Sequence, residues 1–158
     1  MVILGIDPGT ARIGIGIIKK TGHDPEYIWH ECIEIEKTTN LPERLEIIHK
    51  KLKAVIKKFK PTHSSVEQLF FFKNAKTAIS VGHARGVILL TLKNAEIPIS
   101  EFTPLQVKQS VTGYGKAEKK QVQKMVQAIL KMKEFPKSDD AADALAIALC
   151  AERCIKVR

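Results

Sequence analysis

The sequence predicts an α/β protein built on one mixed sheet of five strands, with helices on both faces of the sheet. The first observation is a group of three short runs near the N-terminus, whose apolar residues are consecutive or alternate with other residues as in strands. The second observation is that amphipathic helical patterns alternate with brief apolar runs after residue 40. Leading strands followed by alternating helices and strands are typical of a layered α/β fold.

Three antiparallel strands are expected at the start of the chain. Residues 2–6 form an apolar, largely β-branched run that stops at Asp7, where a Pro-Gly sequence makes a turn. Residues 12–19 alternate isoleucine with glycine, which indicates a strand whose glycine face is closely approached by another element. A turn at residues 21–25 then leads to a third alternating run at residues 27–36.

The rest of the chain is expected to alternate helices with two further strands. Apolar residues three and four positions apart predict an amphipathic helix over residues 41–60. The same reasoning, with Gly and Pro as boundaries, predicts a strand at 64–68, a helix at 74–94, a strand at 97–102, a short helix at 104–110, a helix that ends near Pro136, and a last helix that begins around 138–140 and runs through Leu149. Since no linker or repeat divides the chain, we expect residues 1–158 to form a single domain.

The composition restricts the class of protein. The chain has 26 Lys and Arg residues against 17 Asp and Glu, and its net charge of +9 favours a polyanion such as nucleic acid as a partner. A merely solvated lysine surface explains the charge equally well until motifs are considered. Without a long apolar run or a signal sequence, we expect a cytoplasmic protein with no membrane partner. The three cysteines lack zinc-type spacing and are expected to be reduced thiols.

Four carboxylates stand in unusually apolar surroundings. Asp7 and Glu67 end two apolar strands, while Asp140 and Asp143 lie near the start of a helix rich in Ala and Leu. Residues three positions apart share one helix face, so Asp140 and Asp143 are neighbours. Buried carboxylates are costly unless something compensates their charge, and a hard divalent cation does so. If the two strands are adjacent, the four groups would converge on two metal ions ~4 Å apart, an arrangement that serves phosphodiester hydrolysis.

Each acid also has an ordinary explanation when it is taken alone. Asp7 before Pro-Gly is a good turn former, and Asp139 and Asp140 are good residues for a helix N-terminus. Glu67 has the least ordinary explanation, because its neighbours are too apolar for a casual surface glutamate. The prediction of a metal site therefore depends on the whole set.

Six segments, in this order along nearly the whole chain, resemble the RuvC family of crossover junction endodeoxyribonucleases. They are GIDPG at 5–9, VEQ at 66–68, GHARG at 82–86, VKQ at 107–109, AEK at 117–119 and DAADALAIA at 140–148. The resemblance implies a ribonuclease H-like fold and a homodimer that nicks opposed strands of a Holliday junction symmetrically, in DNA recombination and repair. It also implies two Mg²⁺ ions in each subunit, for which Mn²⁺ can substitute, and association with a branch-migration helicase complex.

The resemblance also implies roles for individual residues. Asp7, Glu67, Asp140 and Asp143 would be the metal-binding catalytic carboxylates; some relatives have His at position 140, and Asp139 is an alternative to Asp140. Phe70 corresponds to an aromatic residue that stacks on bases, an interaction worth ~1 to 3 kcal/mol per base. Phe71 and Phe72 follow it, and three successive side chains cannot all face one way, so which of them contacts DNA stays open.

Basic residues around these segments are expected to contact phosphates. Lys108 and Lys119 fall at positions that resemble the DNA-facing or active-site lysines of the family. The remaining candidates for the DNA-contacting surface are Arg12, Lys73, Lys76, Arg85, Lys116 and Lys120. The helix over residues 74–94 has more apolar surface than one core-facing stripe needs, which predicts a dimer interface. Gly82 and Gly86 would permit close approach of a helix there, although packing within one subunit explains them as well.

Three other functions remain open at this point. A DNA-binding module would keep the basic surface and the dimer but make the acids structural. Residues 6–10 also resemble the phosphate loop of actin-like kinases and ATPases, although that fold needs two lobes and this chain is short. A ribonuclease H-like enzyme that acts on structured RNA is the third alternative, and RNA substrates would distinguish it from a DNA enzyme.

Overall fold

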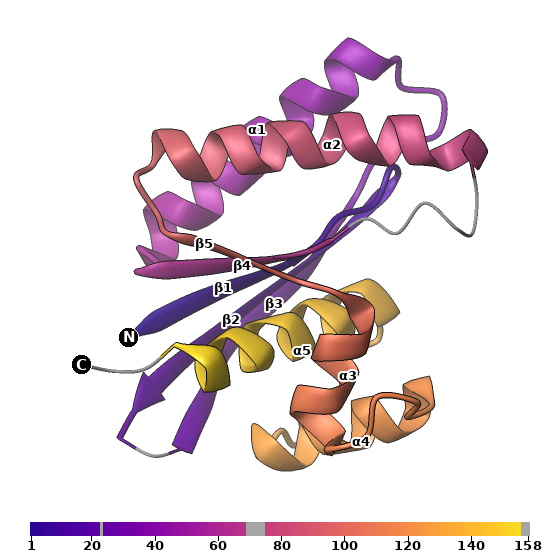
Figure 1. Cartoon of the computed structure of the whole chain (residues 1–158). Coiled ribbons are helices and arrows are strands. Elements are labelled where there is room, and N and C mark those ends of the chain that lie inside the picture. Colours follow the sequence, from indigo (N-terminus) through magenta and orange to yellow (C-terminus); the bar gives the residue numbers. More distant parts are fainter. Residues whose placement is uncertain (23, 69–74, 156–158) are drawn as a thin grey trace.

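A five-stranded mixed sheet forms the centre of the computed structural model, which describes residues 1–22, 24–68 and 75–155 (Figure 1). The strands are β1 (Val2–Asp7), β2 (Arg12–Thr21), β3 (Asp24–Glu34), β4 (His63–Glu67) and β5 (Ile99–Phe102), and they lie in the order β3-β2-β1-β4-β5. β1, β2 and β3 pair in antiparallel fashion, whereas β4 runs parallel to both β1 and β5. The predicted mixed sheet with three antiparallel leading strands is confirmed.

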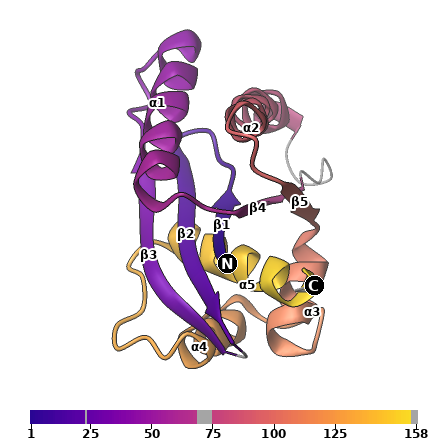
Figure 2. The same cartoon turned by 90° about the vertical axis from the view of Figure 1, so that its left-hand side faces the viewer.

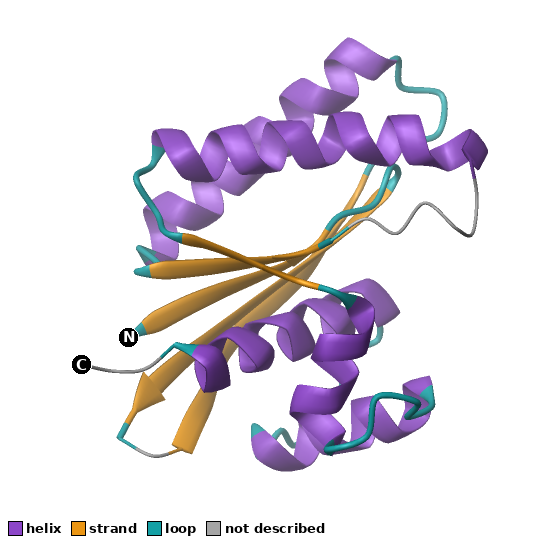
Figure 3. Ribbon diagram, viewed as in Figure 1, coloured by secondary structure: helices purple, strands orange, loops and turns teal. Residues whose placement is uncertain are grey.

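Helices cover both faces of this sheet, so that the molecule has three layers (Figures 2 and 3). The helices are α1 (Leu41–Phe59), α2 (Ala75–Asn94), α3 (Pro104–Thr112), α4 (Lys119–Ile129) and α5 (Asp139–Cys154). α1 and α2 lie on one face, and α5 lies on the other with α3 and α4 beside it. None of the helices in the described residues is long and apolar enough to cross a membrane.

The alternation of side chains along β1 divides the core between the two faces. Leu4 and Ile6 are fully buried in the cluster formed with α1 and α2, whereas Ile3 is fully buried in the cluster formed with α5. Because both faces are covered, the central strands carry apolar residues on both sides. α5 is itself buried along most of its length, which explains its unusual run of Ala and Leu.

Glycines let α5 lie directly on β1 and β2. A Cβ atom built on Gly5 would be 2.1 Å from the carbonyl oxygen of Ala144, and one built on Gly14 would be 1.8 Å from that of Asp140. Any side chain at these positions would collide with the helix backbone. The predicted close approach to the glycine face of residues 12–19 is thereby confirmed, and the approaching element is α5.

Some predicted ends of elements are wrong. The third strand begins at Asp24 rather than at residue 27, because Pro25 and Asp24 still pair with Lys20 and Thr21 across the hairpin. The last strand begins at Ile99 rather than at residue 97, because the Ile97 amide completes the end of α2 by donating to the Leu92 carbonyl. α1 ends one residue earlier than predicted, since the cap residue after Phe59 has left-handed backbone geometry.

Candidate active site

Two of the four carboxylates are placed side by side by strand pairing. β1 and β4 are parallel neighbours whose last paired residues are Ile6 and Val66. Asp7 and Glu67 each follow directly and end their strands. Since parallel strands lie ~4.8 Å apart, both residues emerge at the same edge of the sheet.

The start of α5 brings the other two carboxylates to this edge. Asp7 pairs with Gly14 across β1 and β2, and the Gly14 backbone contacts the carbonyl of Asp140. Ser138 caps the helix, because its side chain accepts a hydrogen bond from the Ala141 amide, and this cap fixes where α5 begins. Asp143 lies one turn further along the same helix face.

Electrostatics show that the four acids influence one another. Burial raises the pKa of Asp7 well above its usual value, and Glu67, Asp143 and Asp140 raise it further. Burial and then Asp143 raise the pKa of Glu67 to about 7, although Lys108 and Lys119 oppose the shift. The pKa of Asp143 is also raised, mainly by burial, while Lys119 opposes that change. Sequence reasoning predicted this convergence of Asp7, Glu67, Asp140 and Asp143, and the structure brings all four to one place.

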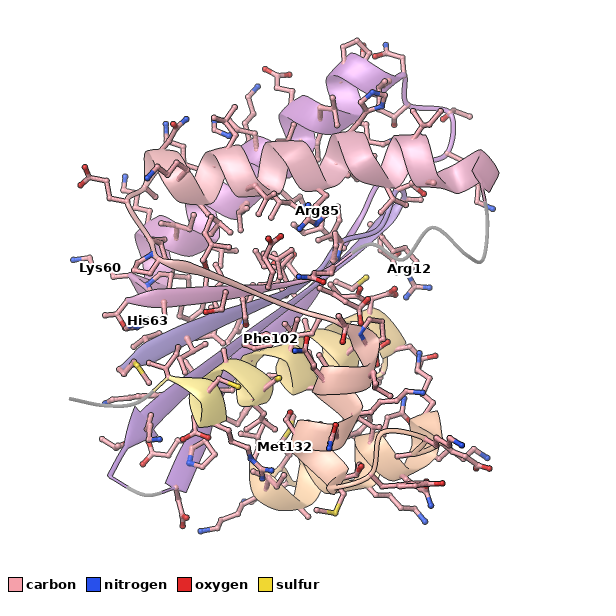
Figure 4. The ribbon with its side chains drawn as sticks, in the orientation of Figure 1. Arg12, Lys60, His63, Arg85, Phe102 and Met132 are labelled. Carbon is pink, nitrogen blue, oxygen red and sulfur yellow. The ribbon has the colours of Figure 1, made fainter. Side chains whose placement is uncertain are left out.

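Two basic side chains hold the acids of α5. The Lys119 ammonium lies 3.2 Å from Asp143 Oδ2 and 3.3 Å from Asp139 Oδ2. Arg12 Nε lies 3.0 Å from Asp140 Oδ2, at the end of the sheet where α5 begins (Figure 4). Asp139 also accepts a hydrogen bond of 3.0 Å from Gln123 on α4. Asp139 is therefore turned toward α4, and Asp140 is the member of the cluster that acts on Asp7.

The four carboxylates supply oxygen ligands that suit a hard divalent cation, but their side chains do not converge closely enough to bind one in this conformation. In the described part of the chain, no group of three or more His, Cys, Asp or Glu side chains is arranged to hold a metal ion as it stands. The physical reason is that like charges repel, while Lys119 draws Asp143 toward α4. The elevated pKa values of Asp7 and Glu67 mark carboxylates whose charge is poorly compensated. Oxygen ligands of this kind fit Mg²⁺, provided that Asp143 turns away from Lys119.

A cavity of about 180 Å³ adjoins the cluster, lined by Glu67, Pro104, Val107, Lys108, Lys119, Val122, Asp143 and Ala146. It places both lysines singled out from the sequence beside two of the acids. A larger hollow of about 880 Å³ lies at the other end of the β2–β3 hairpin. This larger hollow is away from the carboxylate cluster, so the candidate site is identified by its acidic and basic side chains and not by the size of the cavity.

The remaining residues that were predicted to contact DNA have different positions. The Arg85 guanidinium forms an ion pair with Glu101 on β5, and its Nε donates a hydrogen bond of 3.5 Å to the carbonyl of Glu67. Lys116 and Lys120 are exposed near the start of α4. Phe70, Phe71 and Lys73, together with the side chain of Lys76, lie outside the described residues.

Sequence reasoning did not anticipate the residues that support Asp140. Ser138 donates a hydrogen bond of 3.4 Å to Asp140 Oδ2, and the Cys32 thiol lies 3.8 Å from the same oxygen. A serine before two aspartates at a helix start is a recognisable capping signal, so Ser138 could have been found. Cys32 could not have been found, because it comes from β3 and meets α5 only through tertiary packing.

Comparison with known proteins agrees with this arrangement. The sequence profile of the family described as crossover junction endodeoxyribonuclease RuvC matches residues 3–151. The RuvC of Desulforamulus reducens is 53% identical over 150 residues, which cover 95% of this chain and 92% of the relative. The RuvC of Petrotoga mobilis is also 53% identical, with the same coverage. The solved structure of Thermus thermophilus RuvC in complex with Holliday junction substrate is 36% identical, with a TM-score of 0.90, over 95% of this chain and 92% of that one.

This protein is of the ribonuclease H-like class, which is defined by its sheet order, its two helical layers and the acids at one sheet edge. The Thermus thermophilus structures that it resembles have the same fold. Within that class, the chain belongs to the RuvC family.

Proposed function

We propose that this chain is a metal-dependent endonuclease that resolves four-way DNA junctions by symmetric paired nicks, in DNA recombination and repair. The observation that carries the proposal is the convergence of Asp7, Glu67, Asp140 and Asp143 beside Lys108 and Lys119. The names of the relatives and the junction-bound Thermus thermophilus neighbour support it. A +9 net charge is suited to a polyanionic substrate.

The four carboxylates would bind two Mg²⁺ ions, for which Mn²⁺ can substitute. The ions would supply positive charge opposite the scissile phosphate and promote ionisation of the attacking water. Asp7 and Glu67 contribute oxygens from rigid strand ends, and Asp140 and Asp143 contribute oxygens from the first turn of α5. Bound cations would also offset the burial and the mutual repulsion that together raise the pKa of Asp7.

Lys119 and Lys108 would act on the phosphate. When Asp143 turns toward the cluster, the Lys119 ammonium loses one of its two carboxylate partners and becomes available to a phosphate oxygen. The water oxygen forms a bond to phosphorus as the bond to the 3′-oxygen breaks, leaving a 5′-phosphate and a 3′-hydroxyl. Positively charged groups beside the cavity stabilise the charge that develops in this transition state.

The DNA surface would extend from the cavity to the exposed lysines. Lys116 and Lys120 would contact phosphates, with Lys73 and Lys76 as further contacts, and Phe70 or Phe71 would stack on bases. Arg85 has less freedom to contact DNA, because its guanidinium is already paired with Glu101. These contacts give affinity and salt dependence without base specificity.

A homodimer would use the outer face of α2. Ile79 and Leu90 are 71% and 59% exposed, respectively. A Cβ atom built on Gly82 or Gly86 meets no described atom within 4 Å, so packing within the described part of the subunit does not require these glycines. A twofold axis through this face would match the pseudo-twofold symmetry of a four-way junction and explain paired cuts.

The wider setting follows from the family resemblance. Residues 1–158 would work as one nuclease domain in the cytoplasm, together with a branch-migration helicase complex.

Cleavage of a synthetic four-way junction tests the proposed function. Asp7→Asn should retain junction binding and lose Mg²⁺-dependent cutting, because the amide cannot supply a charged ligand. Asp24→Asn is the matched control, since its carboxylate pairs with Lys131 away from the cluster. Full cutting by Asp7→Asn would refute the role assigned to that residue.

The same experiment separates the alternatives. Junction binding by the unaltered protein without cutting, in Mg²⁺ or Mn²⁺, would indicate a binding module. Faster cleavage of structured RNA than of junction DNA would indicate an RNA enzyme. Saturable ATP binding would favour the kinase-like interpretation of residues 6–10.

A further inference from the structure

One oxygen of Asp140 is held by three donors that come from three different elements. Arg12 Nε on β2 lies 3.0 Å from Oδ2, the Ser138 hydroxyl before α5 lies 3.4 Å away, and the Cys32 thiol on β3 lies 3.8 Å away. Within the described residues, no donor is assigned to the other oxygen, Oδ1. Oδ2 of Asp140 is therefore occupied by these donors, whereas Oδ1 is available to bind a cation.

Arg12 is itself braced on two sides. Its Nη2 lies 3.3 Å from the Ser138 hydroxyl and 3.4 Å from Glu34 Oε1. Arg12 and Glu34 are paired residues of β2 and β3, so the sheet fixes the position of the Arg12 backbone opposite Glu34. The planar guanidinium contacts these groups through two separate nitrogens, Nε for Asp140 and Nη2 for Ser138 and Glu34, whereas an ammonium has a single nitrogen.

We propose that Arg12 is a positioning residue that holds Asp140 Oδ2 and so presents Oδ1 to the metal ions as a single-oxygen ligand. This inference rests on the proposed function, because it assigns Asp140 as a ligand. Ligating carboxylates are commonly oriented by such outer partners, and loss of a partner typically lowers metal affinity ~10- to 100-fold.

A different role for Arg12 predicts the opposite sign. If the guanidinium merely competed with metal ions for Asp140, its removal would leave a more negative site and strengthen cation binding. If Arg12 orients the carboxylate, its removal weakens binding despite the added negative charge. The direction of the change in metal affinity therefore distinguishes the two roles.

The test is Mn²⁺ affinity of the full chain without DNA, measured by calorimetry or by electron paramagnetic resonance of free Mn²⁺. Arg12→Gln should raise the Kd at least ~10-fold. Arg12→Lys keeps the positive charge but lacks the planar guanidinium with its several nitrogens, and it should give a smaller loss of Mn²⁺ affinity. Lys131→Gln removes the same charge from an exposed ion pair with Asp24 and should leave the Kd unchanged.

Each outcome decides the inference. Unchanged or tighter Mn²⁺ binding by Arg12→Gln, with normal binding by the unaltered protein, overturns the positioning role alone. Absence of Mn²⁺ binding by the unaltered protein overturns the proposed function as well. A thermal unfolding curve for each variant identifies any loss of affinity that comes from unfolding, and Arg12→Lys then supplies the comparison in a folded protein.

Discussion

Gly14 has the tightest contact with the site, and replacing it with alanine should slow catalysis in a protein that still folds. The new Cβ atom would lie 1.8 Å from the Asp140 carbonyl oxygen and 2.3 Å from its carbonyl carbon, whereas real Cβ contacts essentially never fall below 3.0 Å. The first turn of α5 must therefore retreat from β2 by the difference, about 1.2 Å. Both atoms belong to backbone, so a change of rotamer cannot relieve the collision.

The expected cost follows from that displacement. Overpacking of a core typically costs ~1 to 3 kcal/mol of unfolding free energy, which a folded domain can tolerate. A displacement of ~1 Å at reacting groups can lower the rate ~100-fold. Gly14→Ala should therefore fold, bind junction DNA and cut it about 100-fold more slowly at saturating Mg²⁺.

Urea denaturation and single-turnover junction cleavage would measure the two effects. Gly16→Ala is the matched control, because its Cβ would lie 2.8 Å from the Leu145 amide nitrogen and calls for a much smaller shift. Gly14→Ala with full activity and unchanged stability would show that α5 does not rest on β2 at this glycine.

Three further predictions concern charge and assembly. The pKa of Glu67 is raised from 4.5 to about 7 in the folded protein, so the folded state binds more protons than the unfolded state between these pH values. With a chelator present to remove metal ions, the free energy of unfolding should therefore fall by on the order of 3 kcal/mol as the pH rises from 4.5 to 7. Glu67→Gln should flatten that part of the urea-denaturation profile, and an unaltered slope would contradict the assigned burial. Lys119→Met removes the cation that opposes the pKa rises of Asp143 and Glu67, and it should reduce cleavage by ~10- to 100-fold while junction binding at low salt persists. Leu90→Glu on α2 should give monomers in analytical ultracentrifugation, whereas Ile28→Glu on β3, also at an exposed apolar residue, should not; a Leu90→Glu dimer would exclude this face as the interface.

The sequence was sufficient to predict those parts of the fold and site that depend on local patterns. The alternation of isoleucine and glycine at residues 12–19 predicted a strand with a closely approached face, and α5 occupies that face. Asp7 and Glu67 could each be placed at a strand end because each ends an apolar run, whereas the adjacency of the two strands was a condition that the structure meets. Those patterns express burial, which a strand or helix period reveals directly.

Features that depend on side-chain direction could not be predicted. Asp139 and Asp140 are adjacent in the sequence, and only the packing of α5 against α4 and β2 turns one toward Gln123 and the other toward Arg12. Arg85 looked like a phosphate contact, but Glu101 pairs with it from a strand that is brought close by tertiary folding. The ends of the third and fifth strands were likewise set by hairpin pairing and by the closing turn of α2.

A crystal structure of the protein grown with Mn²⁺ is the most direct test of the acidic site. Two anomalous difference peaks ~4 Å apart are expected among the carboxylates of Asp7, Glu67, Asp140 and Asp143, with Asp143 turned away from Lys119. Absence of Mn²⁺ from this edge of the sheet, with Asp143 still bound to Lys119, would contradict the assignment of these acids as metal ligands.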